Sequence, residues 1–178
     1  MSKPIRYLKR TRRLVLAALL FGFIFAFLVP EPVTIPVHGA SSADWHQDTF
    51  WYEPWGSSGV HKGVDIFANK GTDVVAASHH LVIYRGQWPK GGNVMIALGP
   101  KWRLHYYAHL DSFSDSARRW FSGGEQIGSV GTSGNAQGKA AHLHYSLVTL
   151  IPYFWLIDSA PQGVKKALYL NPITYFDN

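Results

Sequence analysis

We predict a mainly β, antiparallel domain preceded by one apolar N-terminal helix, and three observations lead to this class. Turn signals rich in glycine and proline recur at short intervals beyond residue 40 of this 178-residue chain. The segments between them are short and rich in Val, Ile and aromatic residues, which favour strands. These intervals leave no room for crossover helices, so the strands are expected to pair antiparallel.

The helix is predicted from an apolar run of sixteen residues, 14–29, which follows a basic segment. This order is typical of an export signal, with the basic end left in the cytoplasm. The run is slightly long for a signal-peptide core and slightly short for a span of about 20 residues. No clean small-x-small cleavage pattern follows it closely. We therefore favour an uncleaved membrane anchor over residues 1–29, with a cleaved signal and a secreted domain as the alternative.

The next segment, 30–40, contains Pro30, Pro32 and Pro36 and is expected to be a stiff, extended linker. A single domain then occupies 41–178. Within it only 112–121 has moderate helical character. The predicted strands are 74–75, 81–84, 93–98, 103–110 and 142–147.

Charge and cysteine content exclude several functions. The net charge of +6 comes almost wholly from residues 1–40, which hold six basic side chains against one acidic. The remainder is close to neutral, so we expect no nucleic-acid partner. The chain has no cysteine. Any metal must therefore be held by His, Asp or Glu.

Two histidine patterns supply such ligands. In the first, His61 and Asp65 flank Gly63, whose permissive backbone lets both side chains turn toward one ion. In the second, His142 and His144 share one face of a predicted strand, roughly 7 Å apart, while Leu143, Tyr145 and Leu147 face the core. Each pattern is weak alone, since a turn with solvated polar residues or a polar strand face would look the same.

The segment 103–110 alternates in the same way. His105, Tyr107 and His109 are expected on one strand face and the intervening residues on the other. A helical zincin motif is excluded because Tyr106 stands where that motif needs glutamate.

In order and spacing, these motifs resemble the M23 peptidases of the lysostaphin or LytM type, over about residues 50–148. His61-Lys62-Gly63-Val64-Asp65 is similar to that family's H-x-G-x-D segment, and Tyr107-Ala108-His109-Leu110 to its Y-x-H-L segment. The similarity continues in Gly71-Thr72-Asp73-Val74-Val75, Gly92-Asn93-Val94-Met95-Ile96, Gly124-Glu125-Gln126-Ile127-Gly128, Gly131-Thr132-Ser133-Gly134-Asn135 and His142-Leu143-His144.

The resemblance implies a lysostaphin-type antiparallel sheet with an open substrate groove. It implies Zn²⁺ held by His61, Asp65 and His144, with His109 and His142 as the catalytic pair, and Tyr52 as a weaker candidate for holding an oxyanion. The implied activity is hydrolysis of peptide bonds in bacterial cell-wall peptidoglycan. With the N-terminal helix, it implies an inner-membrane protein whose domain lies in the periplasm or outside.

Several departures from the family pattern bear on substrate preference. Ala140-Ala141 replaces the usual Gly-Pro, and His79-His80 stands where a turn is usual. His105 is expected on the groove wall or surface. Residues 150–157 are expected to form a lid or packing segment, with a membrane-facing patch less favoured. Two other functions stay open: a catalytically silent regulatory module of the same fold, and a zinc protease acting on exported proteins. The oligomeric state is left open.

Overall fold

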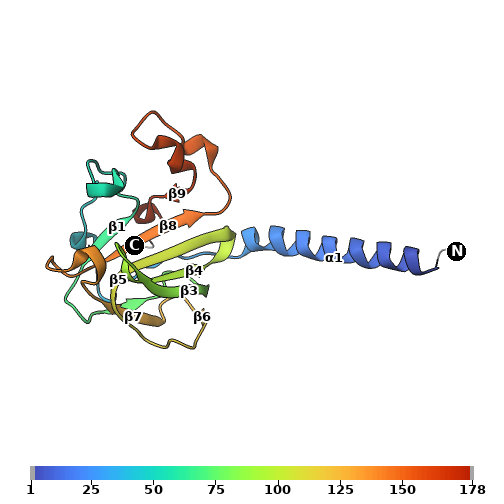
Figure 1. The fold of residues 1–178 in the computed structure, drawn as a ribbon, viewed down its shortest axis with the longest axis horizontal. Coiled ribbons are helices and arrows are strands. Elements are labelled where there is room, and N and C mark those ends of the chain that lie inside the picture. Colours follow the sequence, from blue (N-terminus) through green and yellow to red (C-terminus); the bar gives the residue numbers. More distant parts are fainter. Residues whose placement is uncertain (1–2, 177–178) are drawn as a thin grey trace.

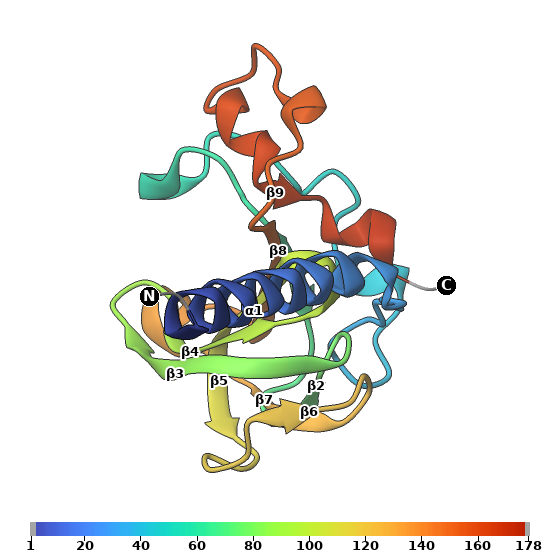
Figure 2. The same ribbon diagram turned by 90° about the vertical axis from the view of Figure 1, so that its right-hand side faces the viewer.

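The computed structural model describes residues 3–176 and shows a β domain with one long helix projecting from it (Figure 1). The helix α1, Lys3–Leu28, has no buried residue in the window Arg10–Leu28, which is apolar and long enough to cross a membrane. Figure 2 looks along this helix and shows the sheet below it and the segment around β9 above. The helix and the domain are thus distinct parts of the molecule.

The domain is one antiparallel sheet, which confirms the predicted fold class. Strands follow the order β1-β8-β5-β4-β3-β6, with β7 pairing β2 and β5, and β9 pairing β8. Their bounds are β1 Val64–Phe67, β2 Asp73–Val75, β3 His80–Trp88, β4 Gly92–Leu98, β5 Arg103–Phe113, β6 Trp120–Phe121, β7 Gln126–Val130, β8 His142–Thr149 and β9 Tyr169–Leu170. The five predicted strands are present, most of them longer than expected. The short strands β1, β6, β7 and β9 were not predicted.

The core lies on one face of this sheet. Leu143, Tyr145 and Leu147 of β8 are fully buried in it, as alternation along that strand predicts. Tyr107 of β5 is also fully buried, and its hydroxyl accepts a hydrogen bond from the backbone N–H of Ala77. Burial raises the pKa of Tyr107 far above its ordinary value, so this hydroxyl stays protonated and serves packing.

The segment between helix and domain is packed against the sheet. Val33 and Val37 are buried members of the core. The backbone of Val37 bridges Val74, and that of Val33 bridges Phe176 near the C-terminal end of the described chain. These contacts tie the end of α1 to the domain.

The helical character expected for 112–121 is wrong. The structure has the end of β5, a turn and β6 there. The Asp115 carboxylate accepts hydrogen bonds from the backbone N–H groups of Ala117 and Arg118, at 2.8 and 3.2 Å. An aspartate that satisfies backbone donors in this way favours a turn over a helix interior.

Candidate metal centre and groove

Strand pairing brings the two histidine patterns together. Asp65 of β1 lies opposite His144 of β8, and His144 in turn lies opposite Ala108 of β5. His61 precedes β1 and folds back over the same place. His61, Asp65 and His144 therefore form one group that could hold a metal ion, although 83 residues separate the two histidines.

The three donor atoms lie very close together. His144 Nδ1 is 2.7 Å from Asp65 Oδ1, and His61 Nε2 is 3.1 Å from each of these atoms. In a tetrahedral site with bonds of about 2.0–2.2 Å, ligand atoms lie about 3.3–3.6 Å apart. The donors are thus slightly closer to one another than the ligands of a bound metal ion would be.

Hydrogen bonds outside this group set the protonation of the His61 ring. Nδ1 of His61 lies 3.0 Å from the carbonyl oxygen of Thr49, which can only accept a hydrogen bond. This contact favours the tautomer with the proton on Nδ1, in which Nε2 carries the lone pair needed to bind a metal ion; the Thr49 hydroxyl also contacts Nδ1, at 2.8 Å. The indole of Trp55 stacks on the other side of the ring, with centroids 4.1 Å apart. His61 is 1% exposed and held in one orientation.

The other two donors complete an electron-rich site. Nε2 of His144 lies 3.0 Å from the Ser146 hydroxyl, which can accept its proton and so leave Nδ1 with a lone pair. Burial raises the pKa of Asp65, but its contacts with the rings of His144 and His61 outweigh burial and hold that pKa well below its ordinary value. An ionised carboxylate and two imidazoles thus converge, which fits a divalent cation of the kind that imidazole and carboxylate bind.

His109 reaches this site through an irregularity in β5. Strict alternation from buried Tyr107 would turn His109 into the core with it. Instead His109 has φ = 64°, in the left-handed region, and the β4–β5 register shifts between Asn93 and Met95. The bulge turns His109 toward the groove and buries Leu110 in its place. The prediction that His105, Tyr107 and His109 share one face is wrong for His109 for this reason.

His109 and His142 both present Nε2 to the site. Nδ1 of His109 donates to the carbonyl oxygen of Ser133 at 2.9 Å, and Nδ1 of His142 donates to that of Ala140 at 2.8 Å. Their rings are 4.9 Å apart, and His142 Nε2 is 3.9 Å from Asp65 Oδ2. Burial lowers the pKa of His109 to about 4. It is therefore neutral at pH 7 and able to accept a proton.

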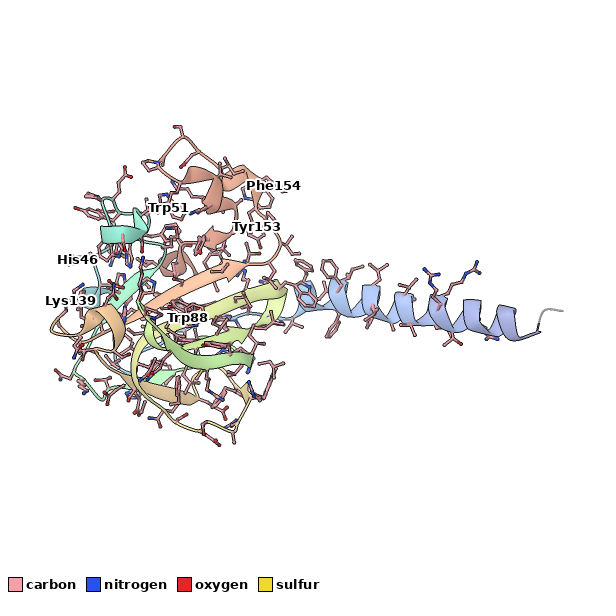
Figure 3. All side chains as sticks on the ribbon, viewed as in Figure 1. His46, Trp51, Trp88, Lys139, Tyr153 and Phe154 are labelled. Carbon is pink, nitrogen blue, oxygen red and sulfur yellow. The ribbon has the colours of Figure 1, made fainter. Side chains whose placement is uncertain are left out.

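The site lies where two hollows meet. The larger, about 700 Å³, runs over the face of β5 and β8 and has aromatic walls that include Trp55, Trp88, Tyr106 and Tyr169. The smaller, about 400 Å³, is lined by Asp65 and His142. His109 and His144 line both. Trp88 lies over the middle of the sheet in Figure 3. An extended peptide in this groove would pass directly over the donor group.

Two residues lie away from the positions expected for them. His105 is fully buried, and its Nδ1 is 2.7 Å from the Tyr145 hydroxyl, so it is neither a groove-wall nor a surface residue. Tyr52 is 55% exposed and lines neither hollow. Sequence patterns did not predict the roles of Thr49 and Trp55. Local spacing carries no information about residues that only the fold places beside His61.

Comparison with known proteins agrees with this geometry. Residues 59–151 match the model of peptidase family M23. The chain is 36% identical over 86 residues to the DD-carboxypeptidase/endopeptidase Mpg of Neisseria meningitidis, covering 48% of this chain and 19% of that protein. It is 30% identical over 105 residues to the murein hydrolase activator NlpD of Salmonella dublin, covering 58% of this chain and 27% of that one. The chain thus spans about a fifth to a quarter of the length of these curated relatives.

The solved structures support the fold. The catalytic domain of lysostaphin from Staphylococcus simulans superposes with a TM-score of 0.59 at 23% identity. The match covers 76% of this chain and 97% of that domain. Because the family match extends over more than half of the residues, the chain belongs to peptidase family M23.

Proposed function

We propose that this protein is a zinc-dependent endopeptidase that hydrolyses peptide bonds in bacterial cell-wall peptidoglycan. One observation carries the proposal: the possible ligand atoms of His61, Asp65 and His144 lie within 4.8 Å of one another, and His109 and His142 stand beside them with Nδ1 bonded to backbone carbonyls. The names of the relatives support the substrate, since one is a DD-carboxypeptidase/endopeptidase and another an activator of murein hydrolases.

Zn²⁺ would be held by His61 Nε2, Asp65 Oδ1 and His144 Nδ1, a set of three protein ligands that leaves a position open. When bound, it lowers the pKa of water and polarises a carbonyl group. Thr49 and Ser146 would orient the two imidazole ligands from outside. Such outer partners fix the tautomer of a ligand histidine and raise its basicity.

The two remaining histidines, His109 and His142, would act as the general base and general acid. Nε2 of His109 or His142 accepts a proton from the attacking water, and the pair returns it to the departing amine as the peptide bond breaks. Backbone carbonyls hold both Nδ1 protons, so neither ring needs to turn during this exchange. The burial of His109 keeps its ring neutral and ready to accept.

The groove selects the substrate. Its aromatic walls suit an extended peptide, and Lys62 and Lys90 line the same cavity. Burial lowers the pKa of Lys62, and the positive charges of Lys165 and Lys90 add to the effect. A carboxylate-bearing peptide would relieve this repulsion, which favours the acidic stem peptides of the cell wall over neutral chains.

We further propose that residues 1–29, including α1, form an uncleaved inner-membrane anchor, that 30–40 link it to the domain, and that 41–178 lie in the periplasm. The length and hydropathy of Arg10–Leu28 support this placement. The similarity to NlpD favours a second candidate, a regulatory module that activates another hydrolase. The presence of every donor and both flanking histidines favours the enzyme.

Full-length protein in detergent, incubated with purified peptidoglycan, separates the two candidates. The enzyme should contain about one zinc per chain and release peptides, and His144→Ala should lose both the metal and the product. A matched control is His46→Ala, which removes an exposed histidine outside the donor group. Equal release by the wild-type protein and His144→Ala, or release only after another hydrolase is added, would refute the enzyme.

A further inference from the structure

We propose that Trp102, Leu150, Phe154 and Trp155 form a membrane-facing patch that enters the interfacial region of the bilayer crossed by α1. The inference rests on the anchoring role proposed for α1. It adds that the domain lies directly on the membrane in one orientation, where an anchor alone would leave it free to turn. The partner of this patch is the boundary between lipid headgroups and acyl chains.

Trp102 joins the domain to the helix. It lies in the turn between β4 and β5, where Lys101 and Trp102 both have left-handed backbones, with φ = 55° and 58°. This conformation is unfavourable for side chains with a Cβ, and here it directs the indole against α1. The indole Nε1–H donates to the carbonyl oxygen of Phe23 at 3.0 Å, and the two rings stack 5.4 Å apart.

A continuous series of contacts leads from Trp102 to the exposed part of the patch. The backbone N–H of Leu150 donates to the Trp102 carbonyl at 2.9 Å. The Tyr153 hydroxyl lies 3.3 Å from Arg103 Nη2, and the ring of Tyr153 stacks on Trp155 at 4.8 Å. Phe154 and Trp155 are 70% and 76% exposed, more than expected of large apolar side chains in water.

The position of these residues agrees with a membrane contact. Phe154 and Tyr153 lie on the side of the domain from which α1 leaves, whereas His46 and Lys139 lie on the opposite side (Figure 3). Trp and Tyr are the residues enriched where a membrane meets water. Glu31, which pairs with Arg103 next to Trp102 in the sequence, has a fully buried side chain and adds no exposed negative charge there.

The length of the apolar run shows how deep the patch must sit. The fifteen residues 14–28 of this run that belong to α1 are about 22 Å long, less than the roughly 30 Å of a hydrocarbon core. The whole helical part of the run, up to Leu28, must therefore lie in the bilayer for the helix to span it. Trp102 contacts Phe23, five residues before Leu28 and so about 7–8 Å back along the helix. The contact with Phe23 therefore places the surface around Trp102 at the depth of the lipid.

A second copy of the chain is the other occupant that an exposed apolar surface could take. The bilayer is favoured because α1 leaves the domain at this surface, and the membrane reaches it without further association.

The donor group lies away from the patch. Strand β5 leads away from α1 (Figure 1), and its residues from Arg103 to His109 place the donor group about 20 Å along the strand from the patch.

Depth measurements with single labels test the proposal. The chain has no cysteine, so one introduced thiol carries the only label. Full-length Phe154→Cys, Leu19→Cys and Lys139→Cys, each bearing an environment-sensitive fluorophore, are reconstituted into phosphatidylethanolamine–phosphatidylglycerol vesicles with and without spin-labelled lipid. Trp155→Cys serves as a second patch position. Lys139 is the matched control, exposed and far from α1.

We expect lipid spin labels to quench at least half of the fluorescence at positions 19, 154 and 155 and to leave position 139 unchanged. Quenching at 19 without quenching at 154 and 155 would overturn the patch while keeping the anchor. Lack of quenching at 19 would overturn the anchor and the patch together. Labels at 154 and 155 that are shielded from water only at high protein-to-lipid ratio, without lipid quenching, would show a second copy and overturn the lipid contact.

Discussion

Strand β5 carries a histidine cluster at each end, and the two clusters differ in what surrounds them. At one end His109 faces His142 and His144 across an open groove. At the other, His105 is fully buried with His80 and Glu31. His105 and His109 are four residues apart on the same strand, yet one faces the core and the other the solvent-filled hollow.

The difference lies in how the ring nitrogens are used. In the groove cluster, backbone carbonyls bind Nδ1 of His109 and His142, and the Ser146 hydroxyl contacts Nε2 of His144. The remaining nitrogen of each ring faces a shared space. In the buried cluster, His105 is bonded to Tyr145, and both ring nitrogens of His80 lack a partner among the described residues. A histidine can therefore take part in chemistry when one ring nitrogen is fixed by a hydrogen bond and the other faces open space. A histidine that is enclosed by the core has a structural role.

The largest expected effect separates the two clusters directly. His109→Ala should lower kcat for peptidoglycan by about 10³-fold, because it removes one partner of the proton exchange. Its zinc content should stay at one per chain, since His109 is outside the donor group. The matched change His105→Gln, four residues away, should keep kcat within a few-fold. A similar loss of kcat in both variants would contradict the division between the clusters.

The next effect concerns the contribution of the buried His105 cluster to the stability of the protein. Glu31→Ala leaves the guanidinium of Arg103 buried without its 2.6 Å partner and should lower the free energy of unfolding by about 3 kcal/mol. Denaturant unfolding of the full-length protein measures this. The exposed carboxylate Glu53 provides the control, and Glu53→Ala should change the free energy by less than about 0.5 kcal/mol.

A smaller effect tests the support of the metal ligands. Ser146→Ala removes the group that holds Nε2 of His144 and should weaken zinc binding by about 10–100-fold. Competition with a chelator gives the affinity. Ser112→Ala, which breaks an exposed serine pair far from the donors, should leave the affinity unchanged. Equal zinc affinities of the wild-type protein, Ser146→Ala and Ser112→Ala would show that Ser146 does not support the metal ligands.

A further effect on stability depends on pH and is absent at neutral pH. Burial, with the nearby charges of His105, Arg85 and His79, lowers the pKa of His80 to about 3. An unfolded histidine titrates near 6.5, so the unfolded chain binds the extra proton first, and His80 costs about 1.4 kcal/mol of stability per pH unit as pH falls from 6.5 to 3. Nothing is lost above pH 7, where both states are neutral. His80→Leu should flatten this part of the stability curve, and an unchanged slope would show that His80 titrates normally.

Local patterns in the sequence determined a good part of this protein. Alternation along 142–147 correctly placed Leu143, Tyr145 and Leu147 in the core, because the side-chain period of a strand depends only on the strand itself. The same period, with Gly63 between His61 and Asp65, identified two patterns of candidate ligands that the fold brings together, and the resemblance to the M23 peptidases selected His144 over His142. Turn residues and short intervals were enough for the antiparallel class.

Only the tertiary structure decided which way His109 faces and what His105 does. The bulge that turns His109 into the groove arises from pairing between β5 and β4, and the acid beside His105 comes from Glu31, 74 positions earlier in the chain. The turn at 112–121 likewise depends on a side chain bonding to backbone groups. Propensity and periodicity describe a segment by itself, whereas a register shift, a buried partner or a contact between Trp102 and Phe23 exists only once distant segments have met.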